Sequence, residues 1–189
     1  VESFISFNSS NIEEYYIREV LKEDTDKEKE LADILKDAAS LHEDLRNYGN
    51  LQDQQKPLVV SGILLALNER KQALLDELKG DEVNTDGTII YSAIETALKR
   101  ANVAPEVKRD KILHQFGVIQ DTALLNRINP TLGETPLKYY TKFLYNHIFK
   151  AIKYTKSSED YLGRFYGEFM SYSGGWSITW YYSYAKAYY

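Results

Sequence analysis

Residues 57–79 read PLVVSGILLALNERKQALLDELK, and this stretch decides the fold. Pro57 suits the first position of a helix, and Gly80 is a typical stop, so the pattern predicts one helix over residues 57–79. Its first half is apolar on nearly every side, which is typical of a helix at the centre of a bundle. The apolar run is about half the length that a membrane span needs, so we expect a buried helix.

Helical spacing continues in both directions from this centre. Upstream, we expect one helix from Asn11 and a second that begins at a Thr25 or Asp26 cap. Gly49, in the left-handed conformation, is expected to end the second helix. Downstream, Thr135 and Pro136 are expected to cap and begin one of five helices, which cover residues 89–98, 105–116, 121–128, 135–154 and 157–172. The sequence therefore predicts an all-α, multi-helix bundle, with a short β or irregular C-terminal tail.

The second upstream helix is expected to have an apolar stripe on one side and Lys, Glu and Asp on the opposite side. The stripe consists of Leu31, Ile34, Leu35, Ala38, Leu41 and Leu45.

Charge divides the chain near a polar loop at residues 80–87. Residues 1–86 carry 20 acidic and 10 basic side chains, whereas residues 87–189 carry 8 and 13. The second part could therefore face phosphates, although an ordinary solvated helix surface explains the same counts. We expect a helical domain over residues 1–175, with a sub-boundary at this loop, and a separate tail over residues 176–189.

The sequence contains no recognisable catalytic, cofactor or metal site. It has no cysteine, which excludes disulfides and thiol chemistry and fits a reducing cytoplasm. His42, His114 and His147 stand in no metal-binding spacing, so each is expected on the surface or half-buried. The N-terminus lacks the pattern of a signal peptide. We therefore expect a cytoplasmic protein that does not engage a membrane.

Basic residues in the second part form the candidate nucleic-acid surface. One group clusters around a turn between two helices, and the other, from Lys138 onward, is interleaved with tyrosines. Basic and aromatic residues on one surface can hold backbone phosphates. The alternative is that the tyrosines pack the core while the lysines keep the surface soluble. The candidates are Lys99, Arg100, Lys108, Arg109, Lys111, Lys138, Lys142, Lys150 and Lys153.

Residues 159–175, EDYLGRFYGEFMSYSGG, resemble a helix that precedes the catalytic domain of N6-adenine DNA methyltransferases in restriction–modification systems. Both the M subunits of type I systems and single-chain endonuclease–methylases carry its D-x-L-G-x-x-Y-E-x-F pattern. Here Gly167 is inserted between the tyrosine and the glutamate. The matching residues are Asp160, Leu162, Gly163, Tyr166, Glu168 and Phe169.

The resemblance covers about residues 11–175 and is closest to the single-chain branch. It implies an S-adenosylmethionine cofactor in the intact family, but the cofactor loop and the N-P-P-[FY] motif are absent from this chain. It therefore implies a non-catalytic helical fragment that contacts DNA and other restriction–modification subunits or domains. The alternative is a helical protein–protein interaction module without enzymatic activity.

The tail over residues 176–189 is half Trp and Tyr, unlike anything upstream. A permitted set of codons for residues 175–189, shifted by one base, gives DGQSLGIILTPKHI, which is similar to the family's continuation. Trp176 and Trp180 have one codon each and give glycine at both family positions. We therefore expect an out-of-frame tail that replaces the catalytic domain. The alternative is a genuine β-hairpin or aromatic anchor, through which the chain would self-associate.

Overall fold

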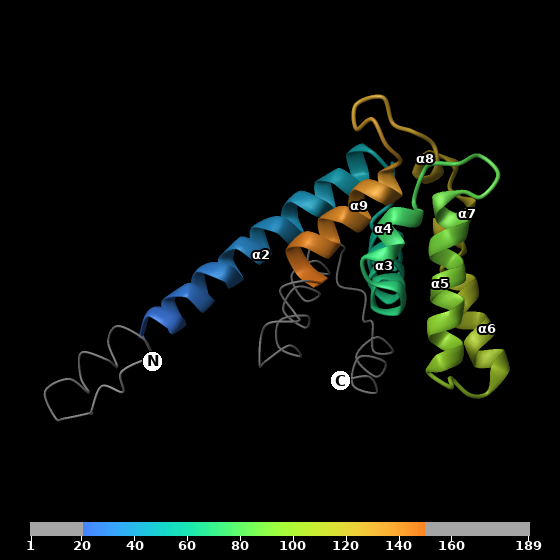
Figure 1. Ribbon diagram of the computed structural model, residues 1–189, viewed down its shortest axis with the longest axis horizontal. Helices are drawn as coiled ribbons and strands as arrows, with labels where there is room; N and C mark the ends of the chain where they lie inside the picture. The colour runs from blue at the N-terminus through green and yellow to red at the C-terminus, as the bar shows by residue number, and fades with distance from the viewer. Residues whose placement is uncertain (1–20, 150–189) are drawn as a thin grey trace, which may run out of the picture.

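The computed structural model describes residues 21–149, and these form a helical assembly (Figure 1). The prediction of an all-α bundle is confirmed, because the described residues contain no sheet and only one isolated bridge, between Asn129 and Glu134. The elements are α2 (Leu21–Asn47), α3 (Lys56–Arg70), α4 (Ala73–Glu77), α5 (Asp86–Arg100), α6 (Glu106–Gln115), α7 (Gly117–Asp121), α8 (Ala123–Asn126), α9 (Pro136–Leu144) and the π-helix η2 (Tyr145–Phe149).

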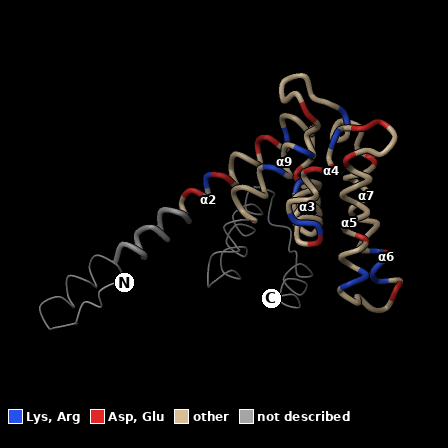
Figure 2. The backbone as a smooth tube through the Cα atoms, in the orientation of Figure 1, with Lys and Arg blue, Asp and Glu red and all other residues tan. Residues whose placement is uncertain are grey.

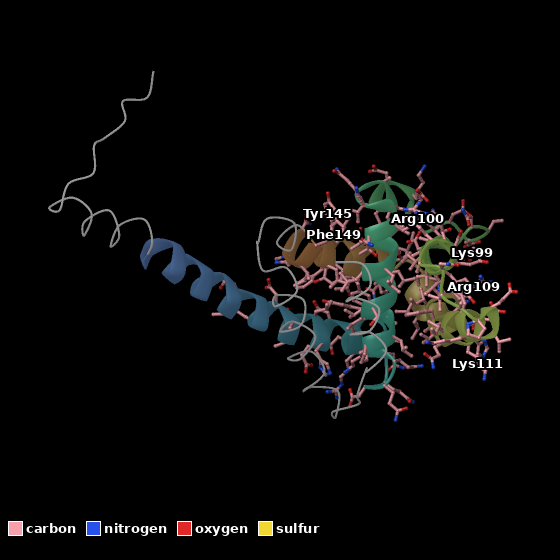
Figure 3. All side chains as sticks on the ribbon, turned by 90° about the horizontal axis from the view of Figure 1, so that it is seen from below. Lys99, Arg100, Arg109, Lys111, Tyr145 and Phe149 are labelled. Atoms are coloured by element: carbon pink, nitrogen blue, oxygen red, sulfur yellow. The ribbon has the colours of Figure 1, made fainter. Side chains whose placement is uncertain are left out.

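Helix α3 is the centre of the assembly, as its composition predicts. Every residue from Lys56 to Leu67 except Leu58 is buried. Figures 1 and 3 show α9 on one side of α3 and α5 with α6 on the other. Gly62 lets α5 and α7 approach closely, since a Cβ there would lie 2.4 Å from Ile119 Cδ1 and 3.0 Å from Ile94 Cδ1.

The predicted single helix over residues 57–79 is wrong, because α3 ends at Arg70 and α4 begins at Ala73. Lys71 has a positive φ of 53°, and the sequence has no Gly or Pro at this turn to indicate it. The turn allows Leu74 and Leu78, both fully buried, to reach the core. Tertiary burial has overridden local helix propensity at this point. Gly80 has a positive φ of 70°, but α4 already ends at Glu77, so the predicted helix stop at Gly80 is wrong.

Helix α2 runs without interruption through Thr25 and Asp26, so the predicted helix start there is wrong. The residues around Thr25 and Asp26 are mostly Lys and Glu, which favour a continuous helix. The left-handed residue after α2 is Asn50, with φ of 49°, and not Gly49. Gly49 is required for packing instead, since a Cβ would lie 2.9 Å from both Leu45 O and Leu125 Cδ2.

The end of α2 packs into the core, whereas its beginning extends away from the other described helices (Figure 1). Ala38, Leu41 and Leu45 are fully buried, so this part of the predicted stripe faces the core. No other described helix lies beside the first half of α2 in this view.

Helix α5 covers the predicted helix over residues 89–98, α6 begins directly after Pro105, and α8 lies within the predicted 121–128 segment. The sequence did not predict α7. Thr85 caps α5, because its Oγ1 accepts a hydrogen bond of 3.2 Å from Thr88 N. Asn126 joins this helix to α7: its Oδ1 accepts from Gly87 N at 2.6 Å, and its Nδ2 donates to Ile119 O at 3.0 Å.

Helix α9 begins at the predicted Thr135–Pro136 pair. Thr135 Oγ1 accepts from Lys138 N at 3.1 Å and donates to the buried carboxylate of Asp86, which also accepts from Gly80 N at 2.9 Å. After Leu144 the helix continues as η2, a π-helix that the sequence did not predict. The predicted residues beyond 149, including the family motif and the aromatic tail, lie outside the described residues. The predicted sub-boundary at residues 80–87 stays a prediction.

Among the described residues, no helix is both long enough and apolar enough to cross a membrane.

Candidate nucleic-acid interface

Five of the candidate basic residues lie around the turn between α5 and α6 (Figure 3). The side chains of Lys99 and Arg100, in the last turn of α5, are 56% and 66% exposed. Lys108 and Lys111 on α6 are also exposed, whereas Arg109 is half-buried. The structure therefore brings together the first group of cations that the sequence predicted.

Local carboxylates neutralise three of these five charges. Lys99 Nζ lies 2.6 Å from Glu95 Oε1, and Arg100 Nη2 lies 2.8 Å from Glu69 Oε1 on α3. Arg109 pairs with Glu106 at 2.5 Å. Lys108 and Lys111 make no ion pair with any other described residue, so their charges remain available to an outside phosphate.

The second group of cations lies on α9, on the other side of α3 (Figures 1 and 3). Lys142 forms an ion pair with Glu134, and Lys138 is half-buried. Lys150 and Lys153 lie outside the described residues. Figure 2 shows the described lysines and arginines interspersed with acidic residues along the chain. The two groups are therefore separate patches among the described residues and do not form one continuous strip.

The tyrosines of α9 pack inward. Tyr140 is fully buried, and its hydroxyl donates to Asp44 O at 2.9 Å. Tyr139 donates to Asp44 Oδ2 at the same distance. Burial raises the pKa of Tyr139 to about 12, and the hydrogen bond to the Asp44 carboxylate adds to this shift. These rings fill the interface between α2 and α9 and are not available as a platform for bases.

Tyr145 and Phe149, which stack 5.9 Å apart on η2, are half-buried. Figure 3 places this pair on the α9 side of α3, away from Lys99, Arg109 and Lys111. Any aromatic contact with nucleic acid from this pair would therefore be separate from the α5–α6 cations.

The three histidines do not converge. His42 belongs to α2, His114 is exposed in the last turn of α6, and His147 Nδ1 lies 2.8 Å from Asp37 Oδ2. Within residues 21–149, no three metal-ligating side chains come together in a way that could hold an ion.

A polar cluster at the turn between α2 and α3 is the site that sequence reasoning missed. Lys56 is 1% exposed, and its Nζ lies 2.8 Å from Asp53 Oδ1 and 3.1 Å from His42 Nε2. Burial lowers the pKa of His42, and the Lys56 charge lowers it further, which favours the neutral imidazole. The hydrogen bond from Lys56 lowers the pKa of Asp53.

This cluster borders a pocket of about 450 Å³ that His42, Arg46, Asn50, Leu51, Gln52, Asp53 and Lys56 line. A lysine directly before an apolar helix, three residues after an aspartate, was the available signal in the sequence. His42 comes from a separate helix, so periodicity could not place it there.

Comparison with known proteins identifies one informative relative. Over 175 residues, which are 92% of this chain, the sequence is 43% identical to the type II restriction enzyme and methyltransferase RM.BcgI of Heyndrickxia coagulans. The chain spans 27% of the length of that relative. No family model matches the chain. No solved structure matches it either. The chain is thus related to a restriction–modification protein.

Proposed function

We propose that this chain is the helical region of an N6-adenine DNA methyltransferase of a restriction–modification system, and that it contacts DNA and neighbouring domains. The observation that carries the proposal is the 43% identity along 92% of the chain to a restriction enzyme and methyltransferase. The all-α fold is in keeping with it, because the described helices offer surfaces for contact.

The α5–α6 turn is the proposed DNA contact. Its exposed lysines at positions 108 and 111 have no ion-pair partner among the described residues, and Lys99 and Arg100 stand exposed beside them. Neutralising backbone phosphates with such cations releases counterions, which makes the affinity fall steeply with salt. Exposed lysines at a turn would position DNA without reading its sequence.

Fluorescence anisotropy with a labelled duplex tests this contact. We expect binding at low salt that weakens as salt rises, and a clear loss in the double variant Lys108→Glu/Lys111→Glu. The matched control is Lys71→Glu/Lys79→Glu, which changes the charge equally at two exposed lysines around α4. Equal losses in the two double variants, or binding that is insensitive to salt, would contradict the proposed contact.

We propose further that methyl transfer to adenine N6 requires S-adenosylmethionine and residues outside this chain. The support is that the family's cofactor loop and N-P-P-[FY] motif do not occur in the sequence. Incubation of the purified chain with duplex DNA and S-adenosylmethionine, followed by mass spectrometry of the nucleosides, is the test. Formation of N6-methyladenine by this chain alone would refute the statement.

Interaction with other protein domains is the second candidate function, and one feature of α2 favours it. In Figure 1 no other described helix lies beside the first half of this helix, which leaves room there for a partner domain. We expect size-exclusion chromatography to show a complex with the catalytic part of a related methyltransferase. Failure to co-elute, together with intact DNA binding, would leave only the DNA-contact role.

The reading frame of the gene tests the proposed origin of residues 176–189. We expect the nucleotides after Gly175, read one base later, to encode the family continuation and a catalytic domain. A different protein sequence in that frame would exclude a frameshift.

A further inference from the structure

We propose that the pocket at the α2–α3 turn binds a phosphate-type oxyanion through Lys56 and Arg46. This inference goes beyond the proposed function and does not depend on it, because the pocket belongs to α2 and α3 whereas the proposed DNA contact lies at the α5–α6 turn.

The ammonium group of Lys56 is buried at the edge of the pocket. An ammonium ion is costly to bury unless acceptors surround it. The group has three N–H donors, and two have partners, namely Asp53 Oδ1 at 2.8 Å and His42 Nε2 at 3.1 Å. Lys56 also lines the pocket, so a small shift of its buried side chain would bring the third donor to an acceptor that enters from solvent.

Arg46 supplies the second cation. It lies one helical turn after His42 on α2, lines the same pocket, and makes no ion pair with any residue that the structure describes. A guanidinium group presents paired N–H donors whose spacing matches a phosphate or carboxylate. Arg46 is also exposed, so it can reach a ligand without losing a partner.

The balance of donors and charges selects an anion. The pocket is lined by two cations, one carboxylate and the amide side chains of Asn50 and Gln52. The carboxylate of Asp53 is already engaged by Lys56, and the neutral form of His42 adds no positive charge. The volume of about 450 Å³ lies in the range of small-ligand pockets and is ample for a phosphate group.

Two sources of phosphate fit this chemistry: the DNA backbone and a free phosphate or nucleotide. The shared test is a titration of the isotope-labelled full chain with inorganic phosphate, followed by amide NMR. We expect saturable shifts at Arg46, Asn50 and Lys56. Shifts that are absent, or that are spread evenly over all surface lysines, would overturn the proposal.

Variants make the test specific. Arg46→Gln should weaken phosphate binding by about tenfold or more, since a charge-assisted pair is lost. Lys36→Gln is the matched control, because Lys36 is an exposed cation on the same helix that does not line the pocket. Equal affinities in the two variants would refute the site. Lys56→Gln is a second probe, used only if its thermal unfolding remains cooperative.

Duplex DNA separates the two sources. If the pocket holds a backbone phosphate, Arg46→Gln weakens DNA binding as well, and added phosphate competes with DNA at the pocket signals. If it holds a free phosphate or nucleotide, DNA binding is unchanged in Arg46→Gln while phosphate binding is lost. Failure of the proposed function has a different signature, namely no DNA binding with phosphate binding intact.

Discussion

Helices α5 and α2 pack against the rest of the molecule through different kinds of contact. Helix α5 meets α3 through apolar side chains and the close approach at Gly62, which we call the apolar interface. Helix α2 adds hydrogen bonds to its apolar contacts, and we call these the α2 seam: Asp37 with His147, His42 with Lys56, and Asp44 with Tyr139 and Tyr140.

The two kinds of contact are expected to contribute differently to the stability of the protein and to the position of α2. Burying a large apolar side chain stabilises a fold by about 1.5–3 kcal/mol, whereas one hydrogen bond adds about 1 kcal/mol net. Hydrogen bonds, however, are directional and require their partners at defined distances. We therefore expect the apolar interface to determine how stable the protein is, and the α2 seam to determine where α2 lies.

The largest loss of stability should come from truncating a buried side chain of the apolar interface. Ile63, at the centre of α3, is fully buried, so Ile63→Ala should lower the free energy of unfolding by about 3 kcal/mol. Leu124→Ala is the control, because Leu124 is 53% exposed and its truncation should cost little. Urea unfolding followed by circular dichroism measures both. A loss below about 1 kcal/mol for Ile63→Ala would show that α3 is not the centre of stability.

Gly62→Ala tests how tightly the same interface is packed. Alanine improves helix propensity by about 1 kcal/mol, but overpacking costs about 1–3 kcal/mol. The new methyl group would lie 2.4 Å from Ile119 Cδ1 and 3.1 Å from Phe116 Cδ1, and both residues are fully buried. We therefore expect a net loss of about 1 kcal/mol in urea unfolding.

Gly117→Ala provides the matched control, since its nearest contact is the flexible Asp121 carboxylate at 3.2 Å. It should be neutral or stabilising. If Gly62→Ala were instead the more stabilising of the two, the interface would have room that the structure does not show.

The same comparison explains what could be predicted from the sequence. The burial of α3 and the starts of α6 and α9 follow from local signals: an apolar run, Pro105, and the Thr135–Pro136 pair. The end of α3 at Arg70 does not, because Lys71 has no turn signature and is forced by the burial of Leu74 and Leu78.

The candidate site divides in the same manner. The cations of the α5–α6 turn are close in sequence, so their clustering was predictable. The pocket at the α2–α3 turn was not, because Lys56 and His42 are 14 residues apart and meet only once α2 folds back on α3. Partners in the α2 seam lie up to 110 residues apart, and no periodicity reports such distances.

Removing a hydroxyl from the α2 seam should have a smaller effect than Ile63→Ala and one no larger than Gly62→Ala. Tyr139→Phe deletes the hydrogen bond to Asp44 Oδ2 and should cost about 1 kcal/mol at neutral pH. The control is Tyr91→Phe, because the hydroxyl of Tyr91 has no hydrogen-bond partner among the described residues and its loss should cost less. Equal losses would mean that the bond to Asp44 contributes nothing.

The raised pKa of Tyr139 also predicts how the stability of the parent chain and of Tyr139→Phe should differ at alkaline pH. The folded-state pKa is raised to about 12, above the value of about 10 in an unfolded chain, so the folded state favours the protonated phenol. This contribution is complete below pH of about 10 and is lost as pH rises through about 12. Tyr139→Phe should therefore show a shallower loss of stability in this window, as measured by urea unfolding at several pH values. An unchanged slope would contradict a protonated Tyr139 hydroxyl in the seam.

The smallest effect should appear on acidification, at the contact between His42 and Lys56. Burial and the nearby ammonium group lower the pKa of His42 in the folded state below the ordinary value of about 6.5. The folded state therefore favours the neutral imidazole, and this contribution is present above pH of about 6.5 and is lost as pH falls below it. NMR titration of the His42 ring should give a midpoint below that of an unfolded control peptide.

Urea unfolding of His42→Gln should accordingly depend less on pH between neutral and mildly acidic conditions than the parent chain does. A His42 midpoint above that of the peptide would mean that the Asp53 carboxylate, 3.8 Å from Nε2, outweighs both burial and Lys56. The pocket would then carry a protonated histidine beside two cations, and the α2 seam would strengthen on acidification. The sign of this one titration therefore decides whether α2 is held at this point by a neutral acceptor or by an added charge.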